Sequence, residues 1–140
     1  QRAYRRETVV AEKLQAMVDL GIANSRMKDF YDLRYLASCF SFDGSTLLAA
    51  IQSTFRRRGE TYPAEMPIAL TAAFAGDASK QEQWVAFMQR SKLDEEGLTL
   101  KQVVEFLAEF LQPPLAALRA GDSFDLTWPL GGPWRTSRAD

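Results

Sequence analysis

One lysine lies at an unusual place on the first helix that the sequence predicts. Apolar residues recur at helical spacing over residues 8–20, where Lys13 follows Val10 by three positions and precedes Met17 by four. Lys13 therefore lies at the edge of the apolar face. The simplest explanation is a side chain whose stem packs on the core while its ammonium reaches water, and the alternative is a cation with a functional role.

An aspartate falls on the apolar face of the next expected helix. Asp29 precedes Leu33 by four positions and Leu36 by seven, and Arg26 lies three positions before it. A carboxylate within an apolar face is costly unless it is paired or acts on a ligand. Three explanations stay open: a surface ion pair with Arg26, a brace or cap for a neighbouring helix, and a carboxylate that points into a cleft beside a cation.

Two other charged groups have plain explanations. Lys28 and Asp32 are four residues apart and are expected to form a solvated pair, although Asp32 is only a short rotation from Asp29. The run Arg56-Arg57-Arg58 could be a nucleic-acid patch. We favour the view that it places cations at a helix C-terminus, where they interact with the helix dipole.

The composition excludes several classes of chemistry. The chain has no histidine and a single cysteine, Cys39, so it holds no Ser-His-Asp or Cys-His centre, no intrachain disulfide and no cysteine-rich zinc site. We expect Cys39 to be a small buried hydrophobe. Motifs of the P-loop, the dinucleotide fold and the D-x-D metal pair are all missing, and no residues are proposed as metal ligands. The net charge is −1, which gives no overall attraction for nucleic acid or membrane.

The elements that position these residues are helices. With 140 residues and 46% hydrophobic residues, the chain is expected to be a single helical domain over 1–140, a mostly α bundle of about five helices. These helices are expected over residues 8–20, 24–40, 45–58, 79–91 and 99–112. Asp43-Gly44-Ser45 reads as the start of the third, and Thr99 and Gln102 fit a capping box at the start of the fifth. Residues 60–67 read as an extended connector, and residues 2–7 could hold a strand end.

The end of the chain is expected to be irregular. Pro113-Pro114 should break the last helix, leaving a turn or two before Gly121. The Gly/Pro/Trp-rich stretch over 124–134 either folds back over the core or forms a binding lip. No segment is apolar enough to cross a membrane or to serve as a signal peptide.

Two motifs resemble a known family. Residues 10–17 contain Ala-Glu-Lys-Leu, and residues 26–33 read Arg-Met-Lys-Asp-Phe-Tyr-Asp-Leu. Together they resemble the AEKL-like and R-x-K-D-x-Y-D-L motifs of AbiEii/AbiGii-type nucleotidyltransferase toxins of bacterial toxin–antitoxin and abortive-infection systems. Residues 67–71, 83–84 and 131–134 are also similar to members of this family, so the resemblance covers nearly the whole chain.

The resemblance implies a reaction and site residues. It implies magnesium-dependent transfer of a nucleotide from an NTP to an acceptor, such as a tRNA, by a polymerase-β-like enzyme with a helical C-terminal half. Lys13 would contact the NTP phosphates, and Asp29 would be the essential acid. Arg26, Lys28 and Asp32 would contact substrate. An antitoxin is the expected protein partner, and the cytoplasm is the expected location.

One departure from the family pattern limits these implications. The family's N-terminal half carries a Gly-Ser dipeptide and a D-x-D pair, whereas Gly44-Ser45 is followed by no such pair, and Arg56 stands where the first acid would be. We therefore expect the C-terminal portion of a longer nucleotidyltransferase-like protein, inactive on its own, with magnesium held elsewhere. The alternative is a non-catalytic helical module that binds an antitoxin or another protein.

Overall fold

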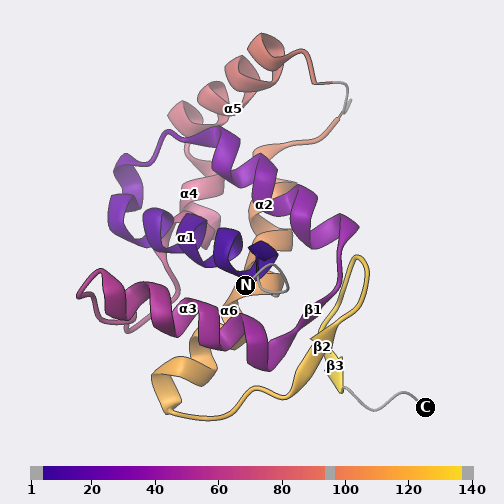
Figure 1. Cartoon of the computed structure of the whole chain (residues 1–140). Helices are drawn as coiled ribbons and strands as arrows, with labels where there is room; N and C mark the ends of the chain where they lie inside the picture. Colours follow the sequence, from indigo (N-terminus) through magenta and orange to yellow (C-terminus); the bar gives the residue numbers. More distant parts are fainter. Residues whose placement is uncertain (1–4, 94–96, 137–140) are drawn as a thin grey trace.

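A computed structural model describes the chain apart from residues 1–4, 94–96 and 137–140. The described part is mostly helical, as predicted, and a small antiparallel sheet lies at its edge (Figure 1). Its helices are α1 (Arg5–Leu20), α2 (Met27–Cys39), α3 (Gly44–Arg57), α4 (Ala72–Gly76), α5 (Ala78–Ser91) and α6 (Leu100–Ala120), with short 3-10 turns η2 (Gly21–Ala23) and η3 (Ile68–Leu70). The strands β1 (Phe42–Asp43), β2 (Leu126–Trp128) and β3 (Arg135–Thr136) are neighbours in that order.

Side-chain caps begin the helices where the sequence predicts them. The Asp43 carboxylate accepts a hydrogen bond from the Thr46 amide at 3.0 Å and starts α3. Thr99 and Gln102 form a capping box at the start of α6, each accepting from the other's backbone amide. These local bonds satisfy amide groups that have no partner inside the helix.

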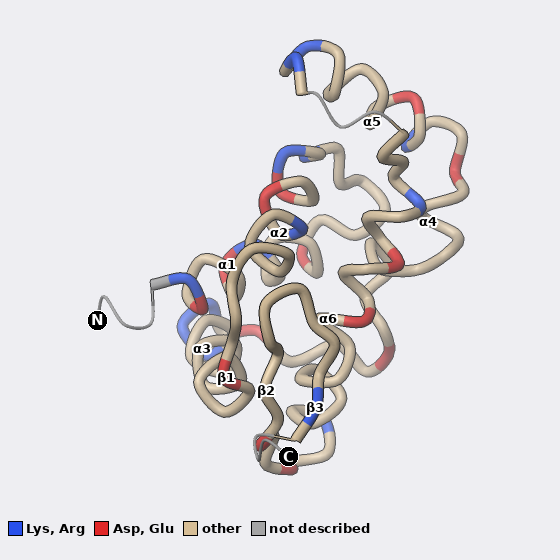
Figure 2. The backbone as a smooth tube through the Cα atoms, turned by 90° about the vertical axis from the view of Figure 1, so that its right-hand side faces the viewer, with Lys and Arg blue, Asp and Glu red and all other residues tan. Residues whose placement is uncertain are grey.

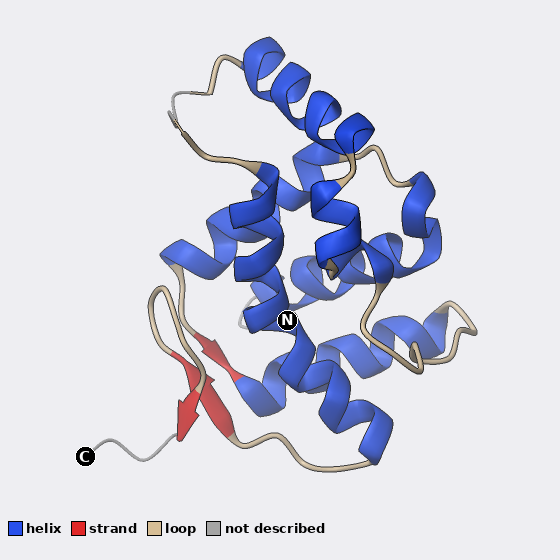
Figure 3. Cartoon of the chain, turned by 180° about the vertical axis from the view of Figure 1, so that it is seen from behind, coloured by secondary structure: helices blue, strands red, loops and turns tan. Residues whose placement is uncertain are grey.

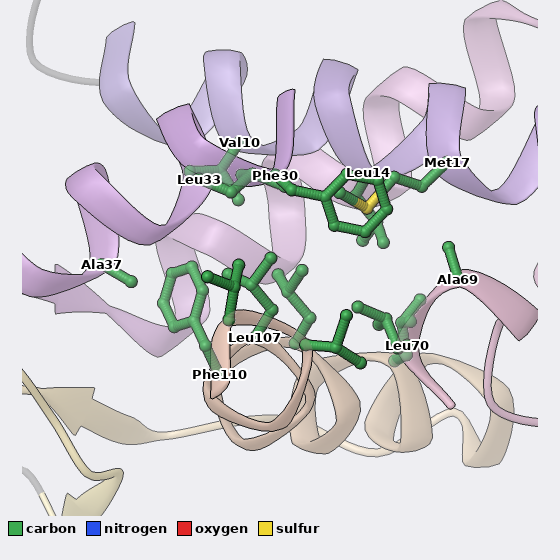
Figure 4. Close-up of a cluster of buried hydrophobic side chains, with 14 of the residues drawn as sticks. Val10, Leu14, Met17, Phe30, Leu33, Ala37, Ala69, Leu70, Leu107 and Phe110 are labelled. Atoms are coloured by element: carbon green, nitrogen blue, oxygen red, sulfur yellow. The ribbon is translucent and has the colours of Figure 1, made fainter. Parts of the chain in front are cut away.

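The core lies between α6 and the helices around it. Helix α1 packs along α3, and α2 and α4 pack on α6. Figure 4 shows buried side chains from α1 and α2 facing those from η3 and α6: Val10, Leu14, Met17, Phe30, Leu33, Ala37, Ala69, Leu70, Leu107 and Phe110. The charged residues of α1 and α2 thus belong to helices whose other faces are locked into the core.

Helix α6 continues through Pro113 and Pro114, so the predicted break is wrong. A proline at position 114 removes the amide that would bond to the carbonyl of Phe110, one helical turn earlier. The indole of Trp134 donates a hydrogen bond to that carbonyl at 2.8 Å. The carbonyl opposite Pro113 belongs to Glu109, a residue with an exposed side chain. The carbonyl that Pro114 leaves without its helical partner therefore has another donor.

The prediction that residues 124–134 are irregular throughout is wrong, because β2 forms within them and β3 follows directly after them (Figure 3). Residue Phe42 pairs with Trp128 in an antiparallel register. Trp128 is fully buried, and its indole donates to the Ala37 carbonyl at 2.7 Å, near the end of α2. Of the two interpretations of the tail, the one in which it folds back over the core is confirmed.

Three smaller predictions differ from the structure. Residues 5–7 belong to α1 and not to a strand end, and residues 2–4 of that prediction lie outside the described residues. Helix α4 was missed because five residues are too few to show a helical period. Cys39 is exposed, since it lies two positions beyond the buried Ala37 and so about 200° around the helix.

Residues 60–67 hold no helix or strand, as predicted for the connector. Within the described residues, no helix is both long enough and apolar enough to span a membrane.

Candidate functional site

The structure brings Lys13 of α1 against the carboxylates of α2. The Lys13 Nζ lies 2.9 Å from Asp29 Oδ1 and 3.4 Å from Asp32 Oδ2. Arg26 Nη2 lies 3.0 Å from Asp29 Oδ2, and Lys28 Nζ lies 2.7 Å from Asp32 Oδ2. Figure 2 shows basic and acidic segments side by side where α1 and α2 meet. We call these five residues the charge cluster; all five are the site residues that the sequence singled out.

Asp29 is the buried member of the charge cluster. Its side chain is 8% exposed, compared with 22% for Lys13 and 57% for Arg26. Its Oδ1 accepts a hydrogen bond from Lys13, whereas its Oδ2 is near Arg26 but makes no hydrogen bond within the described residues. The two cations beside this carboxylate offset part of the hydration that it loses on burial.

Two of the explanations left open for Asp29 coexist in the structure. Asp29 pairs with Arg26, which lies three positions earlier and directly before α2. Asp29 also braces α2 against α1 through its contact with Lys13. The third, a carboxylate beside a cleft, is consistent with its position on the wall of a pocket. Lys13 remains partly open to solvent, so an anionic ligand could reach it.

The outer pair of the charge cluster is also as predicted. Lys28 is 74% exposed and bonds to Asp32 across one helical turn. The hydrogen bond from Lys28 to the Asp32 carboxylate, and the charge of that carboxylate, raise the pKa of Lys28 above its usual value. Lys28 therefore carries a full positive charge at neutral pH.

Two pockets lie on either side of the charge cluster. The first, here the α1 pocket, has a volume of about 390 Å³, and residues on its wall include Glu12, Lys13, Gln15, Asp19, Arg26 and Arg58. The second, here the α2–α5 pocket, measures about 580 Å³, and its wall includes Arg26, Lys28, Asp29, Gln83, Phe87 and Arg90. Arg26 borders both pockets, so the charge cluster separates two spaces that could each hold a substrate.

A buried lysine that the sequence analysis missed fixes the segment before α2. The Lys80 Nζ of α5 donates to the Asn24 carbonyl at 2.8 Å, and the Asn24 side chain accepts from the Arg26 amide at 2.8 Å. Both Lys80 and Asn24 are buried. Lys80 precedes the buried Trp84 by four positions, which is the spacing that could have revealed it.

The arginine run lies at the C-terminus of α3, as predicted from the helix dipole, but it also has a specific partner. Arg57 Nη2 and Arg58 Nη2 each lie 2.9 Å from a different carboxylate oxygen of Glu12 on α1. These contacts join residues 45 positions or more apart. Sequence spacing holds no indication of such a long-range contact.

The described residues do not fit a magnesium site. Among them, no group of three or more histidine, cysteine, aspartate or glutamate residues is placed to hold a metal ion. Asp29 and Asp32 face Lys13, Arg26 and Lys28, whose positive charges would repel a divalent cation. The cluster is better suited to anionic groups that can take over the contacts of its cations.

Comparisons with known proteins agree with the motifs. A family model described as nucleotidyl transferase AbiEii toxin, type IV TA system, matches residues 1–110. The matched region contains the whole charge cluster, Glu12 and the arginine run, and it ends within α6. No curated protein and no solved structure matches the chain.

Proposed function

Because the chain belongs to the AbiEii family of nucleotidyltransferase toxins of type IV toxin–antitoxin systems, we propose that it is the helical part of an enzyme that transfers a nucleotide from an NTP to an RNA acceptor such as a tRNA. The observation that carries this proposal is the charge cluster between two pockets. A transfer reaction needs two substrates to meet at one reacting centre, and this arrangement provides a space on each side of it.

The proposed roles are those that the family resemblance implies, and the exposure of each side chain supports them. Lys13, partly exposed on the α1 pocket, contacts the NTP phosphates. Asp29 is the essential acid, and its burial keeps it in one orientation. Arg26, Lys28 and Asp32 contact the substrates. A phosphate group competes with Asp29 for Lys13 and Arg26, so before substrate arrives the carboxylate holds both cations in place.

The metal chemistry would belong to another part of the nucleotidyltransferase. We propose that any magnesium required is held by carboxylates outside this helical part, so that residues 1–140 alone transfer no nucleotide. The whole protein would act in the bacterial cytoplasm, where NTPs and RNA are present, under the control of an antitoxin. The second candidate, a non-catalytic module that binds a protein partner, would need none of the charge cluster's chemistry.

The test is a transfer assay with labelled NTPs, magnesium and total RNA. The full product of the gene is compared with Gln1–Asp140 alone, and each is assayed with Lys13→Ala and Asp29→Asn. Lys101→Ala and Glu105→Gln are matched controls, because these residues form an exposed 3.9 Å pair on α6 that includes no member of the charge cluster.

We expect the full product to label RNA and both cluster variants to lose at least about a hundredfold in rate, while the controls keep theirs. Circular dichroism establishes that each variant is folded. Transfer that survives Asp29→Asn would contradict the assigned roles. A folded full product that labels no acceptor with any NTP would instead favour the interaction module, and transfer by Gln1–Asp140 alone would show that this chain holds its own metal ligands.

A further inference from the structure

The third arginine of the run, Arg58, reaches the same pocket as Lys13, although 45 residues separate them. Arg58 borders the α1 pocket together with Lys13 and Arg26, so cations from α1, from the start of α2 and from the end of α3 converge on one space of about 390 Å³. Resting on the function proposed above, we propose that Arg58 is a third polyphosphate-binding residue of the α1 pocket and that Glu12 is its positioning residue.

The backbone at Arg58 is held by the end of α3. Arg58 donates its amide to the Thr54 carbonyl, and Gly59 follows with φ +67°, the left-handed conformation that ends a helix. The Glu60 amide then bonds back to the Phe55 carbonyl at 3.0 Å. Arg58 therefore leaves the last turn of the helix in a fixed direction.

Two residues of α1, Glu12 and Gln15, tie this turn to that helix. Glu12 accepts from Arg57 and Arg58 at 2.9 Å each. The buried Gln15 donates to the Glu60 carboxylate at 2.9 Å. Because Glu12 precedes Lys13 directly in the chain, the contact that holds Arg58 comes from the residue next to the first cation.

The charges near the α1 pocket favour an anion once a ligand can share them. Three cations and two carboxylates lie on the pocket wall: Lys13, Arg26 and Arg58 against Glu12 and Asp19. Glu12 contacts one guanidinium nitrogen of Arg58, and within the described part of the chain the other N–H groups of that side chain stay available. Arginine can bind a phosphate through two parallel hydrogen bonds, and three convergent cations match the successive phosphates of a polyphosphate chain.

The arginine run supplies its own controls. Arg57 contacts Glu12 in the same way but is not on the wall of the α1 pocket, and Arg56 lies one position earlier on the exposed end of α3. Arg56→Ala, Arg57→Ala and Arg58→Ala remove the same charge from consecutive positions. If long-range electrostatic attraction alone holds the polyphosphate, the three changes should weaken its binding equally. If the polyphosphate contacts Arg58 directly, Arg58→Ala should weaken its binding most.

The experiment measures binding of inorganic tripolyphosphate to Gln1–Asp140 by titration calorimetry in about 0.1 M salt. We expect Arg58→Ala to weaken binding about tenfold, Arg58→Lys to weaken it less, and Arg56→Ala and Arg57→Ala to change it by less than about twofold. An unfolding curve for each variant establishes that the fold is kept.

Glu12→Gln tests the positioning role through the sign of its effect. Removal of a carboxylate should tighten the binding of an anion if charge alone matters. If Glu12 holds Arg58 in place, the same change weakens tripolyphosphate binding about threefold, and it has no further effect in the Arg58→Ala background.

Three results would overturn the proposal: no binding of tripolyphosphate by the unaltered chain, equal losses for all three arginine variants, or tighter binding by Glu12→Gln. The outcome is separable from that of the transfer assay. Binding through Arg58 without any transfer by the full gene product contradicts the proposed function alone. If the full gene product transfers nucleotide, and Arg58→Ala changes neither tripolyphosphate binding nor the KM for NTP, only the role of Arg58 is contradicted.

Discussion

The hydrogen bond from Trp134 to Phe110 predicts that the tail and the prolines of α6 depend on each other energetically. The Trp134 indole donates at 2.8 Å to the carbonyl that Pro114 leaves without its helical partner. Trp134→Phe removes this donor but keeps a ring that can stack on Phe110, as the indole does with its centroid 5.9 Å away. Pro114→Ala restores the amide that would bond to the same carbonyl.

The expected size of the effect follows from the state of that carbonyl. An acceptor left without a partner inside a protein costs about 1–3 kcal/mol, and the lower end applies here because the bond is only partly buried. Trp134→Phe should therefore lower the free energy of unfolding by about 1 kcal/mol more in the unaltered chain than in the chain that carries Pro114→Ala. That difference is the coupling between the two sites.

The assay is equilibrium unfolding in urea, followed by circular dichroism, of the four chains of this double-mutant cycle. With a slope of about 2 kcal/mol per molar urea, the coupling corresponds to about 0.5 M in the unfolding midpoint. Trp84→Phe is the matched control, since its indole donates to the Leu98 carbonyl at 3.0 Å, which no proline affects. Trp84→Phe should lower the free energy of unfolding by the same amount with and without Pro114→Ala.

Equal costs of Trp134→Phe in the two backgrounds would refute the reasoning. They would mean that the indole contributes by packing alone and that α6 passes its prolines without help from the tail.

Two further predictions concern the start of α3. A Cβ at Gly44 would lie 2.5 Å from the Leu126 carbonyl oxygen, so Gly44→Ala should lower the free energy of unfolding by about 1–3 kcal/mol. Gly76→Ala is the control, because open space surrounds Gly76 and the change should be neutral or slightly stabilising. Equal stability of the two variants in thermal unfolding would contradict this prediction. Hydrogen bonds from the Ser45 hydroxyl and the Thr46 amide lower the pKa of Asp43, so the ionised carboxylate stabilises the fold above its usual pKa of about 3.9 and loses that contribution as the pH falls through its folded value. Asp43→Ala should cost about 1 kcal/mol at pH 7 and progressively less below about pH 3.9, and a cost that stays constant with pH in urea titrations would contradict a role for the charge.

Much of the helical framework could be predicted because its determinants are local. Apolar periodicity placed α1, α2, α3 and α5, and the capping residues Asp43 and Thr99 marked helix starts that the structure retains. The motif around Asp29 also identified residues that lie together in space. Helix periodicity and side-chain caps act over a few residues, so they can be recognised without knowledge of the fold.

Only the tertiary structure decided the contacts between distant segments. The continuation of α6 depends on Trp134, the pairing of β1 with β2 joins residues 42 and 128, and the end of α3 is tied to α1 through Glu12. The sequence by itself determined most of the helices, their starts and the residue types of the charge cluster. Which cation meets which carboxylate, and which carbonyl each tryptophan satisfies, depends on how the chain folds back on itself, because these bonds join groups far apart along it.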